Sequence, residues 1–128
     1  MTGRAAGRLA PTVLAALVLA VFANALGGAF VFDDSADILQ NASAKAATFL
    51  ERLAAMNRPL TKASYALQDL IHGPWAAGFH AVNVILHLAA ALLAYALIRR
   101  ALRLTGAEDG AAALVALAAA ALSAAHPA

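Results

Sequence analysis

The stretch "GFHAVNVILHLAAALLAYALI", residues 78–98, decides the fold class of this chain. It contains no Asp, Glu, Lys or Arg and is followed at once by "RRALR", residues 99–103. At about 1.5 Å per helical residue it is about 30 Å long, which matches the hydrocarbon core of a bilayer. Trp75, just before it, is a residue type enriched at membrane interfaces, and Gly73-Pro74 breaks the preceding segment. The pattern predicts a transmembrane helix over 78–98.

Two further apolar stretches flank this one. Residues 9–32 also lack Asp, Glu, Lys and Arg, and as a helix they would extend about 36 Å. Residues 110–125 follow the polar turn "TGAEDG" and are mostly alanine, so hydropathy alone makes their insertion marginal. Together the three stretches predict an all-α membrane fold with three transmembrane helices and a helical extracytoplasmic loop between the first two.

The first apolar stretch also has features of a cleavable signal peptide. Ala23-Asn24-Ala25 has the small-x-small pattern of a cleavage site. The apolar run continues past Ala25 to Phe32, however, and this extra length favours a membrane anchor that stays with the chain.

The composition agrees with a membrane protein. Of the 128 residues, 63% are hydrophobic and 12% are charged, whereas soluble domains have just under half apolar and roughly a quarter charged residues. There is no cysteine, which excludes disulfides, thiolate metal ligands and cysteine nucleophiles within this sequence. The nine Lys and Arg residues form no basic stripe with interleaved aromatic residues, so nucleic-acid binding is not indicated.

The arginines orient the predicted spans. Arg4 and Arg8 precede the first span and three arginines follow the second, and cytoplasmic segments carry the excess of basic residues. Two crossings separate these clusters, so both agree on a cytoplasmic N-terminus in a multi-pass protein of the cytoplasmic (inner) membrane. The predicted segments are a cytoplasmic N-terminus 1–8, span 9–32, an outer loop 33–77, span 78–98, a cytoplasmic turn 99–109, span 110–125 and an outer end 126–128.

The outer loop contains two amphipathic helical patterns. The first, Ser43–Met56, places Phe49, Leu50, Leu53 and Met56 on one face. The second, "RPLTKASYALQDLI" over 58–71, starts with Pro59 in a first-turn position. Such helices either lie along the membrane surface or pack against further protein. The second helix has one side formed by Leu60, Ser64, Leu67 and Ile71.

Three acidic residues follow the first apolar stretch. Asp33 and Asp34 come directly after Phe32, and Asp37 follows three residues later. Acids at such a place cap and favour the N-terminus of a following helix, or mark the edge of the hydrocarbon. Alternatively, an acid pair at the mouth of a membrane cavity provides a general base or holds a divalent ion. Sequence physics alone leaves both interpretations open.

Polar residues of the 78–98 stretch share one helical face. His80, Asn83 and His87 stand at i, i+3 and i+7. The two histidines are about 10 Å apart along the axis, too far to chelate one ion unaided. We expect Asn83 and His87 to hydrogen-bond neighbouring helices, whereas His80 lies at the outer end, near the depth of the acids. Arg58 is either a solvated charge or an anion contact.

Four stretches, in this order and spacing, resemble the N-terminal part of GT-C-type multi-pass membrane glycosyltransferases. The resemblance is closest to protein O-mannosyltransferase-like members that carry C-terminal tetratricopeptide repeats. It covers nearly the whole chain from residue 30 to 127. Each of the four stretches has low specificity by itself, and the resemblance rests on their order and spacing. The stretches are "FVFDD" (30–34), "RPLTKASYAL" (58–67), "GFHAVNVILHLAAALLAYALIRR" (78–100) and "ALSAAHP" (121–127).

The resemblance implies roles for several of these residues. Asp33 would be the base that activates an acceptor hydroxyl, and Asp34 its partner in acceptor positioning or metal contact. Arg58 would lie near the phosphate of a polyprenyl-phosphate sugar donor, and the acceptor would be a protein or glycan outside the cytoplasm. A divalent metal ion is a possible cofactor of this site. Three further residues match pattern positions or lie near them without an assigned role, namely Asp37, His80 and His126.

The resemblance also implies ten or more spans, whereas this sequence predicts three. We therefore expect an N-terminal piece of a sugar-transferring membrane enzyme, inactive alone because the enclosed donor cavity needs the remaining helices. The alternative is a small three-span membrane protein with a structural or assembly role, its acids merely capping. A carrier that uses the His80, Asn83 and His87 stripe ranks last, because three spans offer little of the repeat symmetry of transporters.

Overall fold

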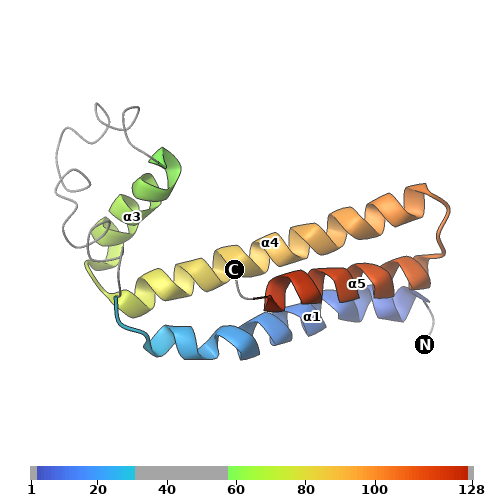
Figure 1. The fold of residues 1–128 in the computed structure, drawn as a ribbon, viewed down its shortest axis with the longest axis horizontal. Helices are drawn as coiled ribbons and strands as arrows, with labels where there is room; N and C mark the ends of the chain where they lie inside the picture. Colours follow the sequence, from blue (N-terminus) through green and yellow to red (C-terminus); the bar gives the residue numbers. More distant parts are fainter. Residues whose placement is uncertain (1–2, 31–57, 127–128) are drawn as a thin grey trace. The chain divides into compact units, whose positions relative to one another are not determined.

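The computed structural model describes residues 3–30 and 58–126, which are helical with no strand in these two ranges. This confirms the all-α prediction. The chain divides into two compact units, one formed by Met1–Asn24 with Val82–Ala128 and the other by Ala25–Ala81. The elements are α1 (Gly3–Phe22), the 3₁₀ helix η1 (Ala23–Gly27), α3 (Pro59–His72), α4 (Ala76–Leu104) and α5 (Asp109–Ala125) (Figure 1).

Two of the three predicted spans are long and apolar enough to cross a membrane. These are Gly7–Gly27, which combines most of α1 with η1, and the whole of α4. The third, α5, has 17 residues and extends only about 25 Å, so it is a shorter apolar helix rather than a full span by length. Helices of this composition indicate a membrane location.

The helix boundaries differ from the apolar boundaries. The regular helix at the N-terminus ends at Phe22 and the 3₁₀ turn ends at Gly27, before the apolar run does, because the pair Gly27-Gly28 has poor helix propensity. In contrast, α4 continues six residues past Ile98 to Leu104. Alanine, leucine and arginine are good helix formers, and cations favour a helix C-terminus. Residues 99–104 of the predicted turn 99–109 are therefore helical.

Three helices of the first unit lie side by side, and α4 runs antiparallel to α1 and α5 (Figure 1). At one end Gly7 lies against Arg99, which in turn bonds Asp109 at the start of α5. At the other end the Phe22 ring meets His87, with ring centroids 4.8 Å apart. The starts of α1 and α5 therefore lie together at the C-terminal end of α4.

Alanine lets α5 approach its neighbours closely. Its buried residues repeat every four positions, at Ala112, Ala116, Ala120 and Ala124, which places them on one face of the helix. Ala116, Ala120 and Ala124 share a core with three residues of α1 that repeat at the same interval, namely Ala10, Leu14 and Val18. Small side chains at every fourth residue are the pattern by which helices pack closely in membranes. The low leucine content of α5 thus has a packing reason.

Replacing a buried alanine of α5 with a larger residue should separate α5 from α1. We expect Ala116→Leu to destabilise the first unit by about 1–3 kcal/mol through overpacking, because Ala116 is fully buried. The matched control is Ala118→Leu, at an exposed position of the same helix. Thermal unfolding in detergent measures both. Equal melting temperatures for the two variants would contradict this packing.

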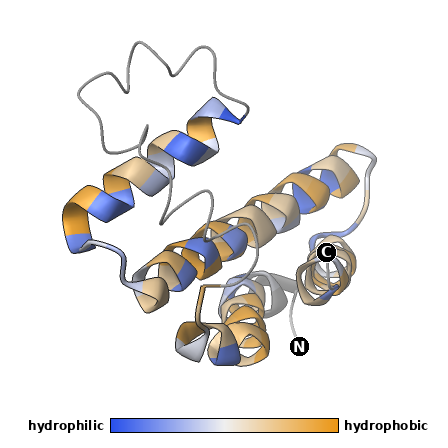
Figure 2. Cartoon of the chain, turned by 60° about the vertical axis from the view of Figure 1, so that its left-hand side comes forward, coloured by the Kyte–Doolittle hydropathy of each residue, from blue (hydrophilic) through white to orange (hydrophobic). Residues whose placement is uncertain are grey.

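Helix α3 begins and ends as its sequence predicts. Pro59 occupies the first turn, and Gly73 ends the helix with φ 67°, a left-handed conformation that suits glycine. The predicted apolar side, however, is not buried: Leu60 and Ile71 are 84% and 72% exposed. Hydrophilic and hydrophobic residues alternate along α3, whereas the helices of the first unit are hydrophobic over most of their length (Figure 2).

Candidate functional site

The predicted site residues fall into two groups. Asp33, Asp34 and Asp37 lie outside the described residues, as does the amphipathic pattern Ser43–Met56. Their predicted roles therefore remain predictions. The other predicted site residues, Arg58, His80 and His126, are described.

Arg58 is exposed and precedes α3 in an unusual backbone conformation. Its φ and ψ are 59° and 60°, the left-handed region, and it is the non-glycine residue with positive φ in the described chain. For an L-residue this conformation costs roughly 1–2 kcal/mol. The Arg58 carbonyl accepts the Lys62 N–H at 3.1 Å and so begins the helix. Because α3 is about 21 Å long, Arg58 and His72 lie at opposite ends of it.

His126 is exposed at the end of α5. Its backbone N–H donates to the Leu122 carbonyl at 3.1 Å, so it terminates the helix. It belongs to the first unit, whereas Arg58 and His80 belong to the second.

His80 faces the segment that follows η1. A β-carbon at Gly28 would come 3.2 Å from His80 Nε2, so glycine leaves room for this ring. The Nε2 atom is buried and has no hydrogen-bond partner among the described residues. The prediction that His80 lies near the depth of the acids stays a prediction, because the acids lie outside the described residues.

An aromatic cluster joins α3 to the start of α4 in the second unit. Phe79 is 2% exposed at its centre. Three rings meet it edge-on, namely His72, Phe30 and Tyr65, with centroid distances of 5.1, 5.6 and 6.0 Å. Such edge-to-face pairs add about 0.5–1.5 kcal/mol each beyond burial. This cluster fixes Phe30, at the end of the first described range, against α4.

The second unit also contains buried polar atoms that make no hydrogen bond among the described residues. His72 Nδ1 donates to the Gly73 carbonyl at 2.9 Å, so in the neutral ring Nε2 carries a free lone pair. Neither this Nε2 nor Gln68 Oε1 has a partner among the described residues, and both are buried. An unpaired buried polar group costs about 1–3 kcal/mol. Together with His80 Nε2, these atoms form a set of hydrogen-bonding sites suited to hydroxyl groups.

Sequence reasoning did not single out His72, Gln68 or Phe79. Gly73-Pro74 interrupts the helix between His72 and Phe79, so no helical periodicity connects them. Gly78 offered a signal, since a β-carbon there would come 2.8 Å from the His72 ring and 2.9 Å from Trp75. A glycine inside an otherwise helical apolar stretch is typical of close packing.

Of the two α4 residues expected to hydrogen-bond neighbouring helices, His87 does so and Asn83 does not among the described residues. His87 Nε2 donates to the Ala124 carbonyl at 2.9 Å, which confirms the predicted bond between helices. The same expectation for Asn83 is not met, because Asn83 is exposed and the described residues give it no interhelical hydrogen bond. Over 3–30 and 58–126, no three metal-ligating side chains converge.

Comparison with known proteins gives one relative. A protein O-mannosyl-transferase of Drosophila melanogaster, Tmtc2, is 35% identical to this chain over an alignment of 129 positions, gaps included. The alignment covers 87% of this chain. The chain is similar to a protein O-mannosyl-transferase. It spans 13% of the length of Tmtc2. No family model matches the chain, and no solved structure does. The O-mannosyltransferase-like part of the predicted resemblance therefore has independent support.

A side chain at Gly78 should disturb the aromatic cluster in a way that Trp75 reports. Trp75 is the single tryptophan of the sequence and lies 5.9 Å from the His72 ring. We expect Gly78→Ala to displace His72 and change the Trp75 emission, with an overpacking cost of about 1–3 kcal/mol. Gly27→Ala is the control, since a β-carbon there meets nothing within 4 Å. If both variants gave wild-type emission, this packing would be refuted.

Proposed function

We propose that the chain forms part of a membrane glycosyltransferase, which moves a sugar from a polyprenyl-phosphate donor to a hydroxyl of an extracytoplasmic protein or glycan. The observation that carries this proposal is the 35% identity to an O-mannosyl-transferase over most of the chain. The apolar helices α1 and α4 support a location in the membrane, where a polyprenyl donor resides. The remaining helices of the enzyme would complete the GT-C-type bundle, with tetratricopeptide repeats beyond it.

The buried cluster supports placing the acceptor near the start of α4. The free lone pair of His72 Nε2 and the oxygen of Gln68 are hydrogen-bond acceptors. Acceptors of this kind receive hydroxyl protons from a sugar or from a serine or threonine side chain. Asp33 is the third residue after Phe30, and an extended chain of three residues spans at most about 11 Å. The base would thus be within reach of this cluster.

In the proposed reaction, the Asp33 carboxylate removes the proton of the acceptor hydroxyl. The oxygen then bonds to the anomeric carbon of the sugar as the bond from that carbon to the phosphate oxygen breaks. The polyprenyl phosphate leaves with the electron pair of the broken bond. Asp34 would orient the acceptor or contact a divalent ion, which when bound would offset charge on the phosphate.

Arg58 is the proposed contact to the donor phosphate. Its exposed guanidinium has no salt bridge to a described acid, so it remains free to bind an external anion. The planar fork of arginine matches phosphate geometry. Its left-handed backbone is the kind of strain that concentrates at binding sites. In this proposal the segment 33–77 lies outside the inner membrane, with Arg99 and its neighbours on the cytoplasmic side.

Removing the charge of Asp33 should abolish transfer. We expect Asp33→Asn in the full-length enzyme to lower turnover by about 10²–10⁴-fold, the usual contribution of a general base. Transfer of labelled sugar to an acceptor, measured in membranes, tests this. Glu51→Gln, another acid of the same loop, is the matched control and should retain activity.

The outcome separates the two functional classes. Equal transfer by Asp33→Asn and the wild type would reject the base assignment. If Asp33→Asn failed only in membrane insertion, the acids would be a topological boundary, as expected for a small protein with a structural or assembly role. Insertion is measured independently by protease protection.

Two substitutions separate the backbone of Arg58 from its charge. Arg58→Gly relieves the left-handed strain but removes the guanidinium, whereas Arg58→Lys keeps a charge without the fork. We expect Arg58→Gly to raise the KM for the donor about 10- to 100-fold, as loss of a charged hydrogen bond predicts, and Arg58→Lys to raise it less. An unchanged KM in Arg58→Gly would remove Arg58 from the donor site.

A further inference from the structure

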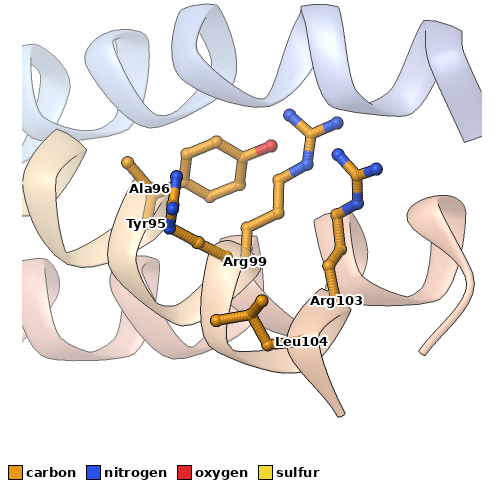
Figure 3. A pocket seen from close by; sticks show the side chains of 6 residues that line it. Tyr95, Ala96, Arg99, Arg103 and Leu104 are labelled. Carbon is orange, nitrogen blue, oxygen red and sulfur yellow. The ribbon is translucent and has the colours of Figure 1, made fainter. Parts of the chain in front are cut away.

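A pocket of about 640 Å³ lies at the C-terminal end of α4, in the first unit, and three of its lining residues are arginines (Figure 3). Arg99 donates to Asp109 Oδ1 at 2.9 Å, and Arg103 Nε lies 3.5 Å from the same oxygen. Within the described ranges Asp109 is the carboxylate that pairs with them. Two guanidinium groups thus share one carboxylate and Arg100 lines the same pocket, which leaves an excess of positive charge among the lining residues. The lining residues are Tyr95, Ala96, Arg99, Arg100, Arg103 and Leu104.

Two buried polar atoms in this pocket make no hydrogen bond of standard geometry with the described residues, although their side chains interact with each other. They are Arg99 Nε and the hydroxyl of Tyr95, a residue that is only 4% exposed. The Tyr95 hydroxyl points toward the Arg99 guanidinium (Figure 3). Leaving such donors unsatisfied is costly away from water. An anionic oxygen that accepts from this side of the pocket would satisfy them.

The surrounding chain holds Arg99 in place. A β-carbon at Gly7 would come 2.6 Å from Arg99 Nη2, so α1 has a glycine where the guanidinium packs. Pro11 lies four residues after Gly7 and has no N–H to donate to its carbonyl. Arg99 is therefore fixed between α1 and Asp109. Arg100 is exposed and the Arg103 side chain is 60% exposed, so both can reach a ligand.

An exposed apolar stripe continues from this pocket along α4. Leu93 and Leu97 are 70% and 69% exposed, and Leu104 is 79% exposed. With Arg100, they are spaced by four, three and four residues, which places all four on one face of the helix. Arginine at the end of an apolar stripe fits a molecule with an anionic head and an apolar tail.

We propose that this pocket binds the phosphodiester headgroup of an anionic phospholipid, with an acyl chain lying along Leu93 and Leu97. Arg100 and Arg103 contact the phosphate, and arginine forks match its oxygens. Basic pockets at the ends of membrane helices recognise such headgroups. The site requires that α4 lies in a membrane but is independent of the transferase reaction and of the residues assigned to it.

Fluorescence quenching by lipids tests the site. The reporter is Leu104→Trp in a Trp75→Phe background, which puts the single tryptophan in the pocket lining. The chain is placed in phosphatidylcholine vesicles that contain brominated phosphatidylglycerol or, separately, brominated phosphatidylcholine. We expect stronger quenching by the anionic lipid. Arg100→Gln and Arg103→Gln should each reduce this preference about five-fold, from about 1 kcal/mol per basic residue near a membrane surface.

Arg8→Gln is the matched control, since Arg8 is an exposed arginine of α1 outside the pocket lining. Retained preference in Arg8→Gln, with loss in the two α4 variants, supports the site. An equal loss in all three variants would mean general surface charge and would overturn it. Inorganic phosphate is added against chloride at equal ionic strength. If phosphate alone removed the preference, the ligand would be free phosphate rather than a lipid.

Native mass spectrometry provides a second measurement that needs no tryptophan variant. The wild-type chain, extracted in mild detergent and mixed with both lipids, should retain phosphatidylglycerol in preference to phosphatidylcholine. Arg100→Gln should lose this retention, and Arg8→Gln should keep it. Equal retention of the two lipids by the wild type would overturn the proposal.

Discussion

A polar side chain on an apolar helix must find a partner within the protein, and this requirement organises the first unit. Water is absent along a membrane span, so each unpaired donor or acceptor is expensive. His87 meets it by bonding the Ala124 carbonyl near the C-terminal end of α5, where helix carbonyls have no intrahelical donor. Arg99 satisfies the same requirement at the N-terminal end of α5 by donating a hydrogen bond to Asp109. Small alanine side chains of α5 lie between these two contacts and share one core with residues of α1 and α4, so α5 can approach α4 closely enough for both bonds to form.

The second unit reverses the usual arrangement of a soluble helix. On α3, Gln68 is buried and His72 is partly buried, whereas Leu70 is 83% exposed. In water, this arrangement would be unfavourable for two reasons: the leucine side chains would stay exposed, and the buried polar atoms would lack hydrogen bonds. Beside lipid or further helices, the exposed leucines gain an apolar environment and the inner polar groups become a protected binding surface. The inversion therefore agrees with the membrane location indicated by α1 and α4.

Hydrophobic periodicity and helix-ending Pro and Gly residues predicted most of the fold. They did not predict contacts between residues on different helices. Pro59, Gly73 and the turn after α4 fixed element ends because their backbone preferences are local. The extension of α4 through Arg103 was missed, since hydropathy marks where lipid ends and not where a helix ends. His80 and Arg58 were found from motifs, but the pairing of His72 with Phe79 depends on the angle between two helices, which no local pattern encodes.

Each unit therefore has its own chemistry on its part of α4. In the second unit, buried polar atoms of Gln68, His72 and His80 have no partner among the described residues, and hydroxyl groups can hydrogen-bond such atoms. Near Arg99, fixed positive charge dominates and suits phosphate. A base that deprotonates a hydroxyl works best away from such cations, because a nearby positive charge lowers its proton affinity. The arginine cluster is therefore better suited to binding an anion than to taking part in the deprotonation that we propose.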